Sequence, residues 1–158
     1  MIRLLTVAAV VFTATAALAA PRTQNAPAPN DGGVPFEELA QQKLAPGQCA
    51  LFLWANTSPT RRILMVTQNP ASARVVMKGK TIDLPLTAWD GEQVMGLYEQ
   101  QTFTGQGLIL TVRFRGETPN GLIGGVVARE GSVELKDAAG WETVVPAAGM
   151  IACQSGGS

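Results

Sequence analysis

Two cysteines, Cys49 and Cys153, bracket nearly all of the patterned part of this 158-residue chain. They can form only one intramolecular pair, which would close a loop of about a hundred residues and stabilise the fold by ~4.7 kcal/mol in the chain-entropy treatment. A redox or metal-binding pair is disfavoured, because the chain has no Cys-x-x-Cys spacing and no histidine. We therefore predict a structural disulfide, with the two Cα atoms within about 7 Å.

Residues 1–19 are organised like a secretory signal peptide. Arg3 gives a positive start, an apolar run begins at Leu4, and Ala17-Leu18-Ala19 is typical of a cleavage site. The run is short for a membrane span, which needs about 20 apolar residues. We expect cleavage after Ala19, a periplasmic location, no stable membrane insertion after cleavage, and oxidising conditions in which a disulfide persists.

The remaining chain divides into a linker, one domain and a tail. Residues 20–34 are rich in Pro, Asn, Asp and Gly, and this composition predicts a disordered linker. Residues 35–154 hold the periodic patterns and suffice for a single domain with a hydrophobic core. Residues 155–158 contain only Ser and Gly and are expected to form a flexible tail.

The domain begins with helix signals over residues 35–44. Pro35 suits a first helical turn, Glu37 and Glu38 complement the N-terminal dipole, and apolar residues recur at helical spacing. Pro46 and Gly47 would end the element. We predict a short helix here, which either caps the core or binds a partner.

From Gln48 onward the pattern changes to short strands separated by turn residues. The clearest strand is 108–115, in which every second residue is apolar and faces inward. Gly79 predicts a tight hairpin turn, and Glu130-Gly131 predicts another turn. The predicted strands are 49–54, 62–67, 73–78, 80–84, 94–103, 108–115, 122–129, 132–136, 141–145 and 150–153. About eight to ten such strands predict an all-β, antiparallel small barrel or sandwich, with the cysteines on its first and last strands.

The composition excludes several classes of function. Removal of Arg3 with the leader leaves 11 basic and 12 acidic side chains, a balance that gives no reason to bind nucleic acid. Without histidine, Ser-His-Asp and Cys-His catalysis is impossible. We therefore predict no catalytic, metal-binding or cofactor-binding residues and no cofactor. Asp90, Glu92 and Glu99 are the carboxylates on which an alternative, an unconventional carboxylate-based enzyme, would depend.

Three residues predict a possible partner surface. Trp89 precedes Asp90-Gly91 and is expected to be exposed on a turn, where a tryptophan can dominate binding. Arg113 and Arg115 share one strand face and could bind an acidic partner, although a solvated, edge-protecting face is the alternative. The other tryptophans, Trp54 and Trp141, are assigned to the core and to its edge.

The cysteines that open and close the strand pattern, together with the leader, resemble the architecture of the periplasmic inhibitors of C-type lysozyme. The stretch from Lys78 to Phe114 is similar in rhythm, with Gly79-Lys80-Thr81-Ile82-Asp83-Leu84, a loop, and a strand around Tyr98. The resemblance implies a small antiparallel barrel and hydrolase inhibition. The family's Ser-Gly-x-x-Tyr loop is replaced here by Trp89-Asp90-Gly91-Glu92-Gln93, and no Lys-Gly follows Tyr98, so no functional residue is transferred.

The sequence therefore predicts a periplasmic, non-enzymatic β domain. It would bind an unidentified envelope protein or ligand, or give structural support to the envelope. A lysozyme or hydrolase inhibitor is the alternative.

Overall fold

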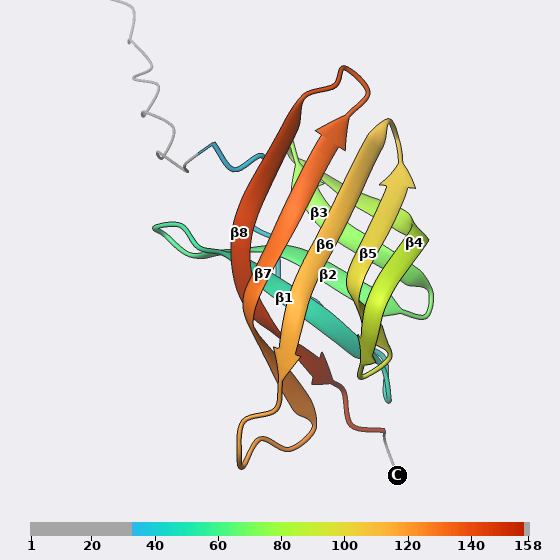
Figure 1. Ribbon diagram of the computed structural model, residues 1–158, viewed down its shortest axis with the longest axis vertical. Coiled ribbons are helices and arrows are strands. Elements are labelled where there is room, and N and C mark those ends of the chain that lie inside the picture. Colours follow the sequence, from blue (N-terminus) through green and yellow to red (C-terminus); the bar gives the residue numbers. More distant parts are fainter. Residues whose placement is uncertain (1–32, 157–158) are drawn as a thin grey trace, which may run out of the picture.

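The computed structural model describes residues 33–156, so the predicted leader, most of the predicted linker and the last two residues lie outside the described part. Its strands form a closed antiparallel barrel in which each strand pairs with the next and β8 pairs with β1 (Figure 1). The strands are β1 (Cys49–Ala55), β2 (Arg61–Gln68), β3 (Ala71–Met77), β4 (Lys80–Val94), β5 (Leu97–Gly105), β6 (Leu108–Glu117), β7 (Gly125–Asp137) and β8 (Glu142–Cys153). The predicted all-β antiparallel class is confirmed, and the barrel is the form adopted.

The predicted disulfide closes this barrel. Cys49 of β1 lies directly opposite Cys153 of β8, the two Cα atoms are 4.0 Å apart, and the sulfur atoms are bonded. The pairing of β1 with β8 continues from there to Ala55 opposite Ala147. The first and last strands are therefore neighbours joined both by a ladder and by a covalent bond.

Three of the hairpins have two-residue turns in which both residues have a positive φ. At the predicted turn, Lys78 and Gly79 have φ values of 51° and 71°, the left-handed pair that a type I′ turn requires. Met95-Gly96 and Gln106-Gly107 repeat this geometry. The single strand predicted over 94–103 was therefore wrong, because the turn at Met95-Gly96 ends β4 and starts β5.

Three other predicted boundaries were also wrong, because the strands continue through them. Glu130-Gly131 lies within β7, where the register with β8 shifts between Ala128 and Gly131. A Cβ on Gly131 would lie 3.0 Å from the Arg113 carbonyl oxygen, so this position accommodates close backbone approach rather than a turn. Likewise, β8 continues through Pro146, and β4 continues through Pro85.

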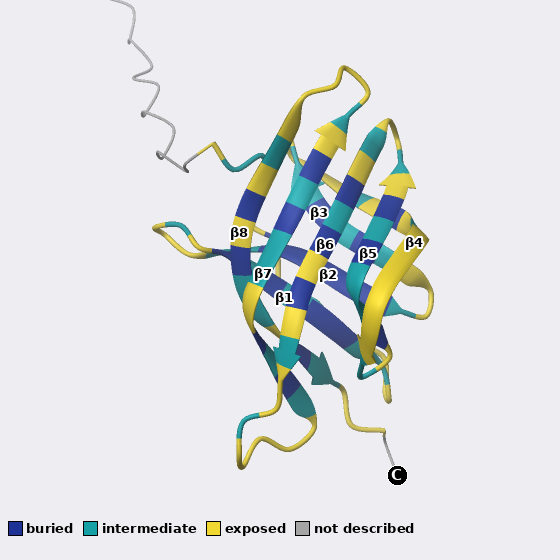
Figure 2. Cartoon of the chain, in the orientation of Figure 1, coloured by how far each residue is buried: buried dark blue, intermediate teal, exposed yellow. Residues whose placement is uncertain are grey.

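Apolar side chains fill the barrel interior. Inward positions alternate with outward ones along β5 to β8, which Figure 2 shows as bands of buried and exposed residues. Leu110, Val112 and Phe114 of β6 are buried as predicted, and the buried amide of Gln101 donates to the Tyr98 carbonyl oxygen at 3.1 Å. The interior is thus a packed core, and ligand recognition is expected on the outer surface.

The helix predicted over 35–44 was wrong. Residues 34–44, which we call the strap, are irregular and extended, although Phe36 and Leu39 are each only 1% exposed. The Glu37 N–H donates to the Val76 carbonyl oxygen at 2.8 Å, and the Leu39 N–H donates to the Arg62 carbonyl oxygen at 2.7 Å. A helix this short is marginal in water, so the backbone partners offered by β2 and β3 decide its conformation. No helix within residues 33–156 is long and apolar enough to cross a membrane.

Candidate functional site

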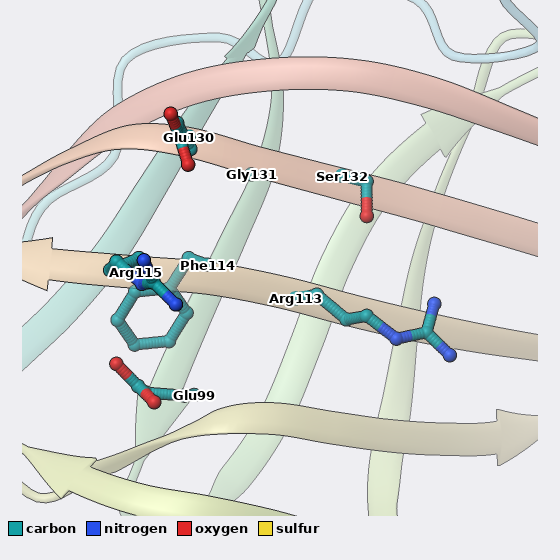
Figure 3. Close-up of a pocket in the computed structure, with 7 residues that line it drawn as sticks. All are labelled: Glu99, Arg113, Phe114, Arg115, Glu130, Gly131 and Ser132. Atoms are coloured by element: carbon teal, nitrogen blue, oxygen red, sulfur yellow. The ribbon is translucent and has the colours of Figure 1, made fainter.

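The neighbouring strands β5 and β6 part near one end of the barrel. They pair from Gly105 opposite Leu108 as far as Gln100 opposite Arg113, but β5 begins three residues earlier, at Leu97, and β6 continues to Glu117. A surface depression of about 360 Å³ lies at this parting. Its lining residues, drawn in Figure 3, are Glu99, Arg113, Phe114, Arg115, Glu130, Gly131 and Ser132. We call this region the open seam.

The two predicted arginines differ in what they contact. Arg113 donates from Nη1 to Glu134 Oε2 at 2.7 Å and from Nε to Gln100 Oε1 at 3.0 Å, so its guanidinium is already engaged. In the described part of the chain, no carboxylate lies within ion-pairing distance of Arg115. Figure 3 shows Arg113 extending away from Arg115, and Glu99 and Glu130 rising from the strands on either side. Arg115 is therefore the cation available for a ligand.

Trp89 is exposed as predicted, but it lies in a strand, β4, rather than on a turn. Its side chain is 58% exposed, and its ring stacks on Tyr98 with centroids 5.6 Å apart and planes at 24°. Tyr98 immediately precedes Glu99, and a Cβ on Gly91 would lie 3.4 Å from the Glu99 Cβ. Tyr98 thus lies on β5, which borders the open seam, and Trp89 lies on β4, the next strand, while the depression itself is lined by other residues.

The strand that carries Trp89, β4, has a free edge. The pairing of β4 with β3 ends at Pro85 opposite Ser72, because β3 begins at Ala71, whereas β4 continues to Val94. Residues 87–93 are all exposed, and this half of β4 is uniformly yellow in Figure 2. The exposure of Trp89 follows from the lack of a neighbouring strand on that side.

The other two tryptophans lie elsewhere. Trp54 is only half-buried, with its ring centroid 6.4 Å from that of Phe52, so its assignment to the core was wrong. Trp141 is 48% exposed and lines a different depression together with Met77 and Leu108, at the start of β6. This depression lies far along β6 from the open seam.

The carboxylates proposed for an unconventional enzyme do not share a pocket. Asp90 and Glu92 are exposed on β4, whereas Glu99 lines the open seam with Glu130 of β7. No group of His, Cys, Asp and Glu that could hold a metal ion occurs among residues 33–156. The chemistry that the open seam offers is hydrogen bonding, ion pairing and aromatic stacking.

Sequence reasoning missed Tyr98 and Glu130 as members of the candidate site. Tyr98 could have been found by placing the hairpin turn at Met95-Gly96, which sets β4 against β5 and brings Tyr98 toward Trp89. Glu130 had been assigned to a turn, and only the pairing of β7 with β6 places it opposite Arg115, next to a shift in the register.

Among residues 33–156, Arg74 is the side chain whose pKa is shifted, and it lies outside the open seam. The hydrogen bonds that Arg74 donates to Asp83 raise the pKa of Arg74. Arg74 also donates to Gln42 Oε1 of the strap at 2.9 Å. The Arg74 guanidinium of β3 therefore helps to hold the strap against this strand.

Comparison with known proteins matches this chain to no family model, no curated protein and no solved structure. The candidate site is interpreted from its own geometry and chemistry.

Proposed function

We propose that this protein is an exported, non-enzymatic binding domain that recognises a partner at the cell envelope through the open seam and the Trp89–Tyr98 pair. One observation carries the proposal. A largely exposed indole on β4 stacks on Tyr98 of β5, and the strand on the other side of β5, β6, carries Arg115, which has no carboxylate within ion-pairing distance in the described residues. Trp, Tyr and Arg are the residue types that most often dominate binding energy at protein interfaces.

Two further features support this proposal. The leader pattern and the Cys49–Cys153 disulfide agree with an oxidising compartment outside the cytoplasm. The packed interior makes the outer surface the place where a partner would bind. On that surface, the open seam combines donors from Arg115 with acceptors from Glu99 and Glu130.

The test is affinity capture from envelope extract with the immobilised, oxidised mature protein. The Trp89→Ala variant is expected to lose the captured partner, since truncation of a dominant tryptophan costs about 2 kcal/mol or more, roughly thirtyfold in Kd. Trp141→Ala is the matched control, because Trp141 has similar exposure but lies away from the open seam. Recovery of the same partner by wild type and Trp89→Ala, or of none by either, contradicts the proposal.

A second candidate is inhibition of a lysozyme-like hydrolase. The observation that favours it is the exposure of every residue from 87 to 93, which lets this half of β4 reach a partner's cleft. Addition of the protein to a lysis assay with a C-type lysozyme should lower the rate, and Trp89→Ala should restore it. An unchanged rate at saturating protein rejects this candidate.

A further inference from the structure

Another seam shows how this barrel accommodates parted strands. β2 and β3 pair only from Gln68 opposite Ala71 to Met65 opposite Arg74, and beyond that point the strap lies between them. Its backbone donates to Val76 of β3 and to Arg62 of β2, and its Leu39 is buried. We call this region the filled seam.

An arginine secures the inserted segment in the filled seam. The Arg62 guanidinium donates to the Leu39 carbonyl oxygen from Nε at 3.0 Å and from Nη2 at 2.7 Å. In return, the Glu38 carboxylate of the strap accepts the Arg62 N–H at 2.9 Å. The strap is thus recognised mainly through its backbone, with charged side chains completing the contacts.

The open seam has the same components but lacks the inserted segment. Glu99 and Phe114 would form the next pair after Gln100 and Arg113, yet this pair is not made. Backbone N–H and C=O groups at such a position require partners. Arg115 stands on the parted strand with no carboxylate in ion-pairing distance among the described residues, and acidic side chains line the depression beside it.

We propose that the open seam receives an extended segment of a partner protein, as the filled seam receives the strap. The segment adds to the backbone of β5 and β6 beyond the last ladder pair by main-chain hydrogen bonds, the general mode of recognition by strand addition. Arg115 donates to a backbone carbonyl of the segment, as Arg62 does to Leu39. Glu99 and Glu130 accept from its donor groups, and Trp89 packs against the adjoining part of the partner. This inference rests on the proposed function and specifies how the partner binds.

The free edge of β4 is a poorer place for strand addition. Its register with β5 shifts between Leu86 and Ala88 and again between Asp90 and Gln93, and Asp90 and Glu92 are charged. Bulges and charges of this kind protect edges from pairing with other chains. The open seam has no such irregularity in the β5–β6 ladder.

A displayed library of short random peptides, selected on the oxidised protein, provides the probe. Selected peptides should bind about tenfold more weakly to Arg115→Ala, because a hydrogen bond from a charged group is lost, and with unchanged affinity to Arg129→Ala. Arg129 is the matched control, since it is an exposed arginine of the next strand that pairs with Glu117. Bound peptides should also slow amide hydrogen exchange in residues 97–99 and 114–116.

Failure to enrich any peptide, or peptides that ignore Arg115 and leave exchange in both segments unchanged, overturns strand addition. The proposed function is judged separately by the envelope partner. If that partner depends on Trp89 but does not slow exchange at the open seam, strand addition is wrong and the binding function stands. If the partner is insensitive to Trp89 as well, both are wrong.

Discussion

The filled and open seams are two places in one barrel where neighbouring strands part: β2 from β3 and β5 from β6. At the filled seam, β2 and β3 part and the chain's own strap supplies the missing backbone partners and buries Phe36 and Leu39. At the open seam, β5 and β6 part and only side chains border the depression. The first arrangement stabilises the fold, and we interpret the second as the surface reserved for a partner.

Because the two seams differ in this way, we expect substitutions at the filled seam to affect stability and substitutions at the open seam to affect binding. Residues of the filled seam hold buried apolar area and internal hydrogen bonds, so their loss should lower the free energy of unfolding. Arg115 at the open seam and Trp89 on β4 are both exposed. Their substitution should affect binding while leaving the fold intact.

The largest effect is expected for Phe36→Ala. The ring is 1% exposed and belongs to the barrel core, so its removal should lower the free energy of unfolding by about 3–5 kcal/mol. Chemical denaturation at constant redox state measures the change. Ile123→Ala, at a side chain 96% exposed, is the control and should change stability by no more than about 0.5 kcal/mol. Equal stability of both variants would show that the strap does not stabilise the barrel.

A somewhat smaller loss of stability is expected when the disulfide between β1 and β8 is removed. These two strands are also paired by a ladder of hydrogen bonds. The double variant Cys49→Ala/Cys153→Ala removes a bridge across a sequence separation of 104 and should cost about 2–5 kcal/mol. Thermal unfolding against the oxidised wild type gives the value. If reduced wild-type protein unfolds at the same temperature as the oxidised form, the bridge adds nothing to a seam already closed by its ladder.

The two arginines compare the seams most directly. Arg62→Ala removes two hydrogen bonds to the Leu39 carbonyl oxygen and should cost about 1.5–3 kcal/mol. Arg115→Ala should stay within about 0.5 kcal/mol of wild type. Denaturant titrations of both variants, run side by side, test this contrast. A greater loss for Arg115→Ala would mean that the open seam is structural and needs no partner.

The smallest effect is expected at the Arg113–Glu134 ion pair on the border of the open seam. Both groups are partly exposed and 2.7 Å apart, so a double-mutant cycle with alanine should give a coupling of about 0.2–1 kcal/mol that falls with added salt. A coupling above that range, insensitive to salt, would place Arg113 among the residues that hold the seam's shape.

Much of this architecture could be predicted from local sequence patterns. Alternation over 108–115 identified the inward face of β6, and Gly79 identified a turn that needs positive φ. The strap was harder, because its apolar spacing fits a helix equally well, and its extended form depends on backbone partners 20 to 40 positions away. The candidate site was found only in part. Trp89 and the arginines could be selected from their neighbours in the sequence. Tyr98 and Glu130 could not, because their positions depend on the register between strands.

Local sequence patterns were sufficient to predict an all-β domain with a structural disulfide and an exposed tryptophan. Those features depend on side-chain periodicity, on cysteine number and on residues that bring their own conformational preference. Two features are visible only in the tertiary structure. The strap fills the space where β2 and β3 part, and no segment of the described chain fills the space where β5 and β6 part. Both outcomes depend on which backbone groups find partners across the barrel, and hydrogen bonds between distant strands leave no periodic trace in the chain.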